Sequence, residues 1–350
     1  MNFAVKLQNN YHFSQFICNF ALRNSSMSPL DAIIKPVERE YHYFQSLYEE
    51  LGVADNPLLR EVLNHIIHKK GKQMRPILTL LFAKLFGEIG DSTYHSALSL
   101  ELVHTASLVH DDVIDESAIR RGQPSVNASF GNKIAVLSGD YLSALSMLYM
   151  ARTNNVQMAK VVGQLAQLLS DGELFQLFES RENVVSEDVY FLIIKKKTAA
   201  LFSACAKLGA LSVDASPEDV EKAAKIGEFI GICFQIRDDI FDYFESSAIG
   251  KPTGSDMREG KLTLPVIYAI RNFGNDEIHR KVEQLKAGSL SDSEIHSLID
   301  FAKSHGGIAY AEGVMKSYRE KVLALLAQFD NKEIVNAIIA FLDYVIGREK

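Results

Sequence analysis

Residues 101–116 read ELVHTASLVHDDVIDE, and this stretch decides the expected fold class. Apolar and small residues recur in it at helical spacing, and the same period continues along most of the chain. Alternating strand patterns bounded by hairpin turns are missing, and no linker separates two parts. Short breaks rich in glycine and proline divide the helices, at residues 87–90, 122–124, 250–254, 260–265 and 305–307. We therefore expect an all-α protein, with one large single-domain helix bundle over residues 28–350.

The acids inside the opening stretch lie on one face of the expected helix. Asp111 and Asp115 are four residues apart, which places them about 40° from each other around the helix axis. Ser107 and His104 continue the same stripe toward the N-terminus, and Asp112 lies beside it. Neighbouring carboxylates at this spacing repel each other and weaken a helix, so a cation that offsets the repulsion is expected here.

A second group of acids with the same DDxxD spacing lies at residues 238–242. Gln235, Asp238, Asp239 and Asp242 fall within about 100° of arc on a helix. Apolar residues surround both clusters, so we expect the carboxylates to point into a shared central cavity. Carboxylates combined with waters and substrate phosphate oxygens suit Mg²⁺. A solvated acidic helix start could explain one such cluster, but two of the same form favour a metal site for a diphosphate.

The charge balance is acidic and argues against nonspecific nucleic-acid binding. Lys and Arg together number 37 against 44 Asp and Glu, which gives a net charge of −7. An acidic protein that holds a diphosphate therefore needs metal ions and a local group of basic residues. The three widely spaced cysteines form neither a zinc motif nor a disulfide framework. No apolar run reaches the length of a membrane span, so we expect a cytoplasmic protein without one.

Residues 1–27 differ from the rest of the chain. They contain Lys6 and Arg23 but no acid, and they lack the compact apolar core of a signal peptide. We interpret them as a disordered extension or as the result of a translation start assigned too early. Ser28, Pro29 and Asp31 predict the opening of the first helix of the folded part.

Basic residues near expected helix starts and breaks are candidates for binding the diphosphate. Arg clasps phosphate oxygens at two points, and free N–H groups at a helix start attract anions. The candidates are Lys72 and Arg75 at a helix start, Arg120 and Arg121 after the first cluster, Lys197 as the inward member of three lysines, and Lys251 and Lys261 in glycine-rich loops.

In their order along the chain, these motifs resemble the trans-polyprenyl diphosphate synthases, also called polyprenyl synthetases. The match runs from about residue 30 to about residue 345. It includes both aspartate clusters and GKQMRP at 71–76, RRG at 120–122, GDYL at 139–142, KTA at 197–199 and GK at 250–251. Residues 124–133, PSVNASFGNK, look most like the long-chain members that make quinone side chains. The resemblance implies an isoprenoid synthase type of fold and a homodimer.

The resemblance also implies the reaction. Isopentenyl diphosphate condenses head-to-tail with an allylic prenyl diphosphate: metals draw off the allylic diphosphate, the isopentenyl double bond attacks the carbocation, and a proton is lost. The metal-binding residues would be Asp111, Asp112, Asp115, Asp238, Asp239 and Asp242, holding three Mg²⁺ per active site. Catalysis would rest on Asp111, Asp115, Asp238 and Lys197. Contacts to the allylic diphosphate would come from Arg120, Lys197, Thr198, Gln235 and Lys251. Isopentenyl diphosphate would bind Lys72, Arg75, His104 and Arg121.

Two small residues before the first cluster predict the length of the product. In this family, large aromatic side chains four and five positions before the cluster stop short chains. Ser107 and Ala106 occupy these positions here, so we expect a medium-to-long product of the octaprenyl or solanesyl class. Candidates for the floor of the tunnel are Met147, Leu148 and Met150, or Leu81, Phe82 and Phe86.

Three other functions share part of the pattern expected of a long-chain prenyltransferase. A short-chain geranylgeranyl or farnesyl diphosphate synthase is the nearest, since only the two small residues speak against it. A noncatalytic partner subunit would show degraded aspartate clusters, and both clusters are intact. A class I terpene cyclase usually pairs one DDxxD cluster with a different second metal motif, and it would not need the Lys72 and Arg75 site.

Overall fold

The computed structural model describes residues 28–68, 71–179, 185–244 and 253–348, and helices make up nearly all of this part of the chain. The α-helices are α2 (Pro29–Ile34), α3 (Glu38–Glu49), α4 (Pro57–Ile67), α5 (Met74–Phe86), α6 (Asp91–Ile114), α7 (Val126–Phe130), α8 (Asn132–Ala151), α9 (Val156–Glu179), α10 (Glu187–Ile194), α11 (Ala200–Leu211), α12 (Pro217–Phe241), α13 (Ser255–Arg258), α14 (Leu264–Phe273), α15 (Asp276–Lys286), α16 (Asp292–Ser304), α17 (Gly307–Leu326) and α18 (Lys332–Gly347). Short 3₁₀ turns η1 (Lys35–Val37) and η2 (Glu50–Gly52) flank α3, and η3 (Lys195–Ala199) is a π-helical turn between α10 and α11. The expectation of an all-α helix bundle is confirmed.

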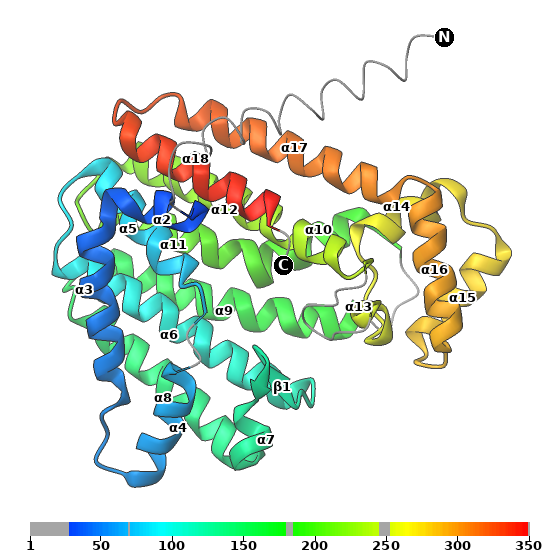
Figure 1. The fold of residues 1–350 in the computed structure, drawn as a ribbon, viewed down its shortest axis with the longest axis horizontal. Helices are drawn as coiled ribbons and strands as arrows, with labels where there is room; N and C mark the ends of the chain where they lie inside the picture. The colour runs from blue at the N-terminus through cyan, green and yellow to red at the C-terminus, as the bar shows by residue number, and fades with distance from the viewer. Residues whose placement is uncertain (1–27, 69–70, 180–184, 245–252, 349–350) are drawn as a thin grey trace.

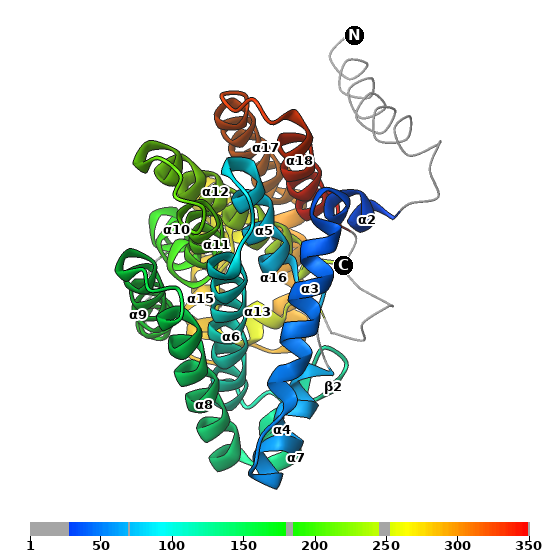
Figure 2. The ribbon, with the colours of Figure 1, turned by 90° about the vertical axis from the view of Figure 1, so that its left-hand side faces the viewer.

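The two helices that carry the aspartate clusters lie in the middle of the bundle. α6 packs against α5, α8, α9 and α11, while α12 packs against α11, α17 and α18. α14, α15 and α16 gather at one end of the molecule, and α3 lies at the other (Figure 1). The view in Figure 2 shows α8 on one side of α6 and α3 on the other. This layering surrounds both clusters with helices on several sides.

The helix ends follow the signals in the sequence. Ser28 accepts a hydrogen bond from the backbone N–H of Asp31, whose side chain bonds back to the Ser28 N–H, so α2 begins with a capping box as expected. Ser216 caps α12, and Pro217 is the first residue of that helix. The expected breaks at residues 87–90, 260–265 and 305–307 all separate helices.

One break forms a structure that the sequence did not predict. Residues 119–124 make a two-stranded antiparallel ribbon, with β1 (Ile119–Arg120) paired to β2 (Gln123–Pro124). Arg121 and Gly122 connect the strands with φ angles of +53° and +73°. A two-residue hairpin turn of type I′ has positive φ at both positions, which Gly122 adopts without strain. The ribbon matters because it fixes the direction of Arg120 and Arg121.

Glycine allows α11 to lie close against α5. A Cβ atom added at Gly209 would lie 2.5 Å from the carbonyl oxygen of Thr79 and 2.9 Å from Cβ of Phe82. Real Cβ atoms do not approach a backbone oxygen so closely, so any larger residue would force the two helices apart. The contact between α5 and α11 in turn fixes Arg75, near the start of α5, over the ring of Phe202 in α11.

Gly209→Ala should therefore lower the free energy of unfolding by about 1–3 kcal/mol, the usual range for overpacking a core. The control is Gly313→Ala in α17, where no described atom lies within 4 Å of an added Cβ. That variant should be neutral or slightly stabilised, because Ala is the better helix former. Denaturant unfolding followed by circular dichroism measures both, and equal effects of the two substitutions would contradict the packing argument.

Candidate active site

The first aspartate cluster lies at the C-terminal end of α6. Asp111 belongs to the last turn, and Asp115 is the residue that ends the helix. Carboxylates at a helix C-terminus face the negative end of the helix dipole, which adds to their mutual repulsion. The pKa of Asp111 is raised to about 6, first by burial and then by the charge of Glu173, whose effect exceeds the lowering by Lys197. Burial is also the main reason that the pKa of Asp115 is raised.

The middle acid of the first cluster has a different environment. Asp112 is 2% exposed, and its carboxylate accepts hydrogen bonds from Arg120 Nε at 2.8 Å and Nη2 at 2.5 Å. Its backbone carbonyl accepts from Asn127 Nδ2 at 3.0 Å. The β1–β2 ribbon therefore brings Arg120 back onto α6, and Asp112 holds this arginine beside Asp111.

The second cluster lies at the C-terminal end of α12. As in the first cluster, its acids differ in their hydrogen-bond and ion-pair partners. Asp238 is paired with Arg348 at 2.6 Å. Asp239 is 3% exposed and accepts from Tyr190 Oη at 2.6 Å and from Gln235 Nε2 at 2.7 Å. Its pKa is raised well above the usual range, chiefly by burial.

Asp242, the third acid, ends α12 and caps the next helix. Its two carboxylate oxygens accept from the backbone N–H groups of Ser255 at 2.9 Å and Asp256 at 3.1 Å. The start of α13, with its free N–H groups, thus faces a carboxylate, as helix dipoles favour. Burial and the charge of Asp242 raise the pKa of Asp256 to about 7.

A lysine lies between the two clusters. The charge of Lys261 acts on both Asp115 and Asp256, and lowers the pKa of each. Lys261 itself is largely buried and contacts Glu259. Lys261 therefore links the ends of α6 and α12 electrostatically, and the cavity shared by both clusters stays a prediction.

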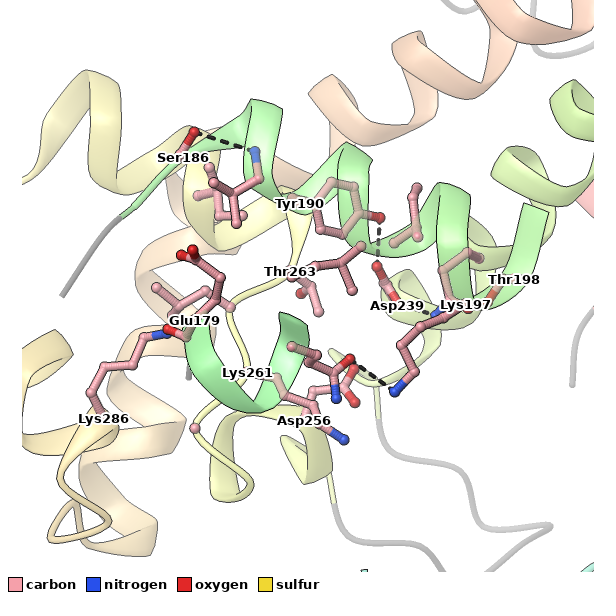
Figure 3. Close-up of a pocket in the computed structure, with 18 residues that line it drawn as sticks. Glu179, Ser186, Tyr190, Lys197, Thr198, Asp239, Asp256, Lys261, Thr263 and Lys286 are labelled. Carbon is pink, nitrogen blue, oxygen red and sulfur yellow. Dashed lines mark hydrogen bonds between the residues drawn. The ribbon is translucent and has the colours of Figure 1, made fainter. Parts of the chain in front are cut away.

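A cavity of about 210 Å³ adjoins the second cluster (Figure 3). Lys197, Thr198, Gln235, Asp239 and Lys261 line it, together with apolar residues of α10 and α14. Thr198 Oγ1 donates to Gln235 Oε1 at 2.6 Å, which extends the chain of hydrogen bonds that ends at Asp239. Of the residues expected to contact an allylic diphosphate, the structure brings Lys197, Thr198 and Gln235 together. Lys251 lies outside the described residues.

The residues expected to bind the second diphosphate form a separate polar group inside the bundle. Arg75, His104 and Arg121 interact electrostatically with one another, and burial together with these arginines holds the pKa of His104 well below its usual range. Glu101 is 4% exposed among them, and its Oε2 atom lacks a hydrogen-bond partner within the described residues. The Arg121 guanidinium lies directly against Gly71, where an added Cβ would be 2.8 Å from Cζ.

Lys72 stands at the edge of this group. Its Nζ lies 5.3 Å from the centre of the Tyr344 ring on α18, and the side chain is otherwise exposed. Lys72 points away from the buried Arg75 because Gln73, the residue just before α5, adopts a left-handed conformation that turns the chain between them. The GKQMRP motif thus presents one cation at the surface and one inside the bundle.

The two residues expected to control product length lie on the buried side of α6. Ala106 is 2% exposed, and Ser107 Oγ donates to the carbonyl of His104 at 2.9 Å. The candidates for the tunnel floor differ in their burial. Met150, Leu81 and Phe82 are buried, whereas Met147 and Leu148 on α8 are 64% and 59% exposed and therefore face away from the core.

Several residues of the site carried no functional prediction from the sequence. Glu173 and Gln176 on α9 both contact Lys197, and Tyr190 on α10 contacts Asp239. Asp256 was not singled out, whereas Lys261 was expected only as a candidate for binding a diphosphate. The spacing of Glu173 and Gln176, three apart on a helix after Gly172, was the available signal, but nothing in the sequence indicates which helix they face.

The donor set fits Mg²⁺ that is held jointly with a substrate. Within the described residues, no three acids, histidines or cysteines converge into a ready-made metal cage. Mg²⁺ is commonly bound through one or two carboxylates together with waters and substrate phosphates. Among the described residues, no hydrogen bond or ion pair engages the carboxylates of Asp111 and Asp115, whose pKa values are raised. They suit that role better than Asp112 and Asp239, whose carboxylates already accept hydrogen bonds.

A family model described as polyprenyl synthetase matches residues 56–300. The nonaprenyl diphosphate synthase of Mycobacterium tuberculosis is 34% identical over 311 residues, which cover 87% of this chain and 90% of that protein. The chain belongs to the polyprenyl synthetase family. This membership confirms the resemblance drawn from the motifs, and with it the class of enzyme, a prenyltransferase that makes polyprenyl diphosphates.

Solved structures of this family share the fold over nearly their whole length. Geranylgeranyl pyrophosphate synthase from Bacteroides thetaiotaomicron is 45% identical with a TM-score of 0.82, and the match covers 92% of this chain and 100% of that one. Polyprenyl synthase from Caulobacter crescentus, solved with calcium and isoprenyl diphosphate, is 29% identical with a TM-score of 0.86, covering 93% and 100%. This polyprenyl synthetase therefore resembles both short-chain and long-chain relatives.

The raised pKa of Asp111 predicts how the synthetase responds to pH without metal. A carboxyl with a raised folded pKa stabilises the fold while it is protonated, and that stability is lost as the pH rises through about 6. Asp111→Asn should therefore be more stable than the wild type by about 1–3 kcal/mol at pH 8 in EDTA. The advantage should shrink toward zero near pH 4. Denaturant unfolding at several pH values measures this difference in stability. A difference that did not depend on pH would contradict the raised pKa of Asp111.

Proposed function

We propose that the protein is a Mg²⁺-dependent trans-prenyltransferase that condenses isopentenyl diphosphate head-to-tail onto an allylic prenyl diphosphate. The observation that carries this proposal is that Lys261 interacts with Asp115 at the end of α6 and with Asp256, which lies beside Asp242 at the end of α12. Separate basic groups flank this region on two sides, as two diphosphate substrates require. The Caulobacter crescentus relative, solved with calcium and isoprenyl diphosphate, supports a divalent cation at such a site.

The acids divide into two roles in this proposal. Asp111, Asp115 and Asp238, with Asp242, would hold Mg²⁺, which supplies Lewis acidity to the departing allylic diphosphate. Asp112 and Asp239 orient neighbours instead: one carboxylate fixes Arg120 and the other fixes Gln235. For Asp238 this means exchanging the ion pair with Arg348 for a metal.

The chain's own cations bind the two diphosphates at separate places. Arg120, Lys197, Thr198 and Gln235 would form the allylic subsite, with Lys251 expected to contribute from outside the described residues. Lys72, Arg75, His104 and Arg121 would form the isopentenyl subsite. His104 is neutral at physiological pH, so it can donate one hydrogen bond without adding a further charge beside the two arginines. The buried carboxylate of Glu101 offsets part of their charge. These groups bind and orient the isopentenyl double bond toward the allylic carbon while the surrounding helices exclude water.

The proposed product is a medium-to-long all-trans chain. Ala106 is small and buried about one turn before Asp111, where a bulky side chain would enter the proposed path of the growing chain. The nonaprenyl relative supports a long product, whereas the geranylgeranyl relative, at 45% identity, supports the short-chain alternative. Incubation with farnesyl diphosphate, labelled isopentenyl diphosphate and Mg²⁺, followed by sizing of the dephosphorylated products, separates these two. Products longer than 20 carbons support the proposal, and a product that stops at 20 carbons gives a geranylgeranyl synthase.

Ala106→Phe should shorten the product by one or more isoprene units, because the aromatic ring would fill the path of the growing chain. The first condensation onto farnesyl diphosphate should continue, since the carboxylates and basic groups are unchanged. Ala106→Ser is the matched control and should leave the product distribution as in the wild type. Thin-layer or liquid chromatography of the labelled alcohols measures the lengths. An unchanged distribution in Ala106→Phe would place the tunnel elsewhere.

The exposed apolar face of α8 supports the proposal of a homodimer. Leu137, Met147 and Leu148 on this helix are 67%, 64% and 59% exposed, with Val136 and Tyr141 beside them. Contiguous apolar surface of this kind marks an interaction site. By length and composition alone, α8 could also cross a membrane, but its opposite side, with Ala135 and Met150, is buried in the core. We therefore propose that a second copy of the chain covers this face. We also propose that the enzyme is cytoplasmic.

The double substitution Leu137→Asp and Met147→Asp should convert the dimer to a monomer, because two charges would have to be buried at the interface. Light scattering coupled to size-exclusion chromatography measures the mass. Val53→Asp, at a position just after η2 that is 81% exposed, is the control and should stay dimeric. A wild-type protein that is monomeric at micromolar concentration would contradict the proposed interface.

A further inference from the structure

Helix α9 lies unusually close to the segment of three lysines. A Cβ atom added at Gly172 would lie 2.8 Å from Cβ of Lys196 and 3.0 Å from Cγ of Lys197. Glycine at this position therefore lets the backbone of α9 approach the stems of both lysines. The residues that flank Gly172, one and four positions away, are placed to reach the lysine head groups.

The π-helical turn at Lys195–Ala199 presents two consecutive lysines to α9. In an α-helix, neighbouring side chains point about 100° apart, so only one of them would normally face a given partner. The wider turn lets each lysine meet its own acid: Lys196 pairs with Asp171 at 2.7 Å, and Lys197 pairs with Glu173. Such turns are frequent at functional sites.

The two ion pairs differ in their surroundings. The side chain of Asp171 is 57% exposed, which is typical of a surface pair, whereas that of Glu173 is 15% exposed. The charge of Glu173 also reaches the first aspartate cluster, since it acts on both Asp111 and Asp115. Glu173 is therefore an interior acid that faces the site, and Asp171 is not.

The ammonium group of Lys197 is held at two points. It contacts the Glu173 carboxylate and donates to Gln176 Oε1 at 3.1 Å. A lysine has three N–H donors and four rotatable bonds in its stem, so two fixed acceptors restrict its position and leave the third donor for a ligand. Lys197 lines the cavity beside Thr198 and Gln235 (Figure 3), and this is where that third donor is available.

We propose that Glu173, assisted by Gln176, is a positioning residue for the allylic diphosphate, acting through Lys197. It fixes the ammonium group at the cavity before the substrate arrives, so that the remaining N–H meets a diphosphate oxygen without loss of side-chain freedom. This inference rests on the proposed function of the site. It differs from a metal role for Glu173, in which the carboxylate would itself bind the cation.

Steady-state kinetics with farnesyl and isopentenyl diphosphates test the inference. Glu173→Gln keeps the shape but removes the charge, and Glu173→Leu also removes the acceptor. The KM for farnesyl diphosphate should rise about threefold in the first and about tenfold in the second, while the KM for isopentenyl diphosphate changes less than twofold. Asp171→Asn, which breaks the neighbouring surface pair, is the control and should leave both KM values unchanged. Equal increases in the two KM values, or the same increase in the control, would overturn the inference.

A double substitution shows whether Glu173 acts through the lysine. If it does, Glu173→Leu combined with Lys197→Gln should raise the KM for farnesyl diphosphate no more than Lys197→Gln alone. Multiplicative effects, or a change confined to the Mg²⁺ concentration that gives half-maximal rate, would assign Glu173 to the metal instead and overturn the proposal. Elongation of farnesyl diphosphate by the wild type is measured first. Its absence would refute the proposed function itself, which is a different outcome from a missing effect of Glu173.

Discussion

The repulsion among carboxylates at the ends of two buried helices is the constraint on which the rest of this structure depends. α6 and α12 both end in DDxxD clusters, so each brings several acids to the negative end of its own dipole. Burial makes the charges still less favourable, as the raised pKa values of Asp111 and Asp239 show. Protein groups alone offset only part of this repulsion. Cations that arrive with a diphosphate would supply the remainder, which links the instability of the free site to its proposed chemistry.

The surrounding elements are arranged to neutralise some acids and to leave others available. The hairpin at residues 119–124 returns Arg120 to Asp112, and α10 brings Tyr190 to Asp239. The N–H groups at the start of α13 donate to Asp242, and Lys261 acts on both Asp115 and Asp256. In the part of the chain that the structure describes, no such direct bond reaches the carboxylates of Asp111 and Asp115, which suits the metal role proposed for them. The buried charges of these two carboxylates therefore lower the stability of the fold at the positions where the proposed reaction needs negative charge.

Much of this organisation could be predicted from sequence, since helical period and spacing describe how side chains lie around a single axis. They gave the all-α class, the common face of Asp111 and Asp115, and the inward direction of Lys197. They could not give the hairpin turn through Arg121 and Gly122 or the π-helical turn, because both depend on backbone conformations outside the regular helix. Nor could they find Glu173 as the partner of Lys197, since that contact joins helices whose packing the spacing does not encode. The different roles of the acids within each cluster have the same origin: they are set by what the neighbouring elements present.

Binding of inorganic diphosphate measured by isothermal titration calorimetry, with and without Mg²⁺, tests the central claim most directly. If metal cations are what reconcile the carboxylates with an anionic ligand, diphosphate should bind in millimolar Mg²⁺ and bind at least 100-fold more weakly in EDTA. Asp111→Asn with Asp238→Asn should abolish that difference. Equal affinity in EDTA and in Mg²⁺ would contradict the account, because the basic groups alone would then suffice and the two aspartate clusters would need another explanation.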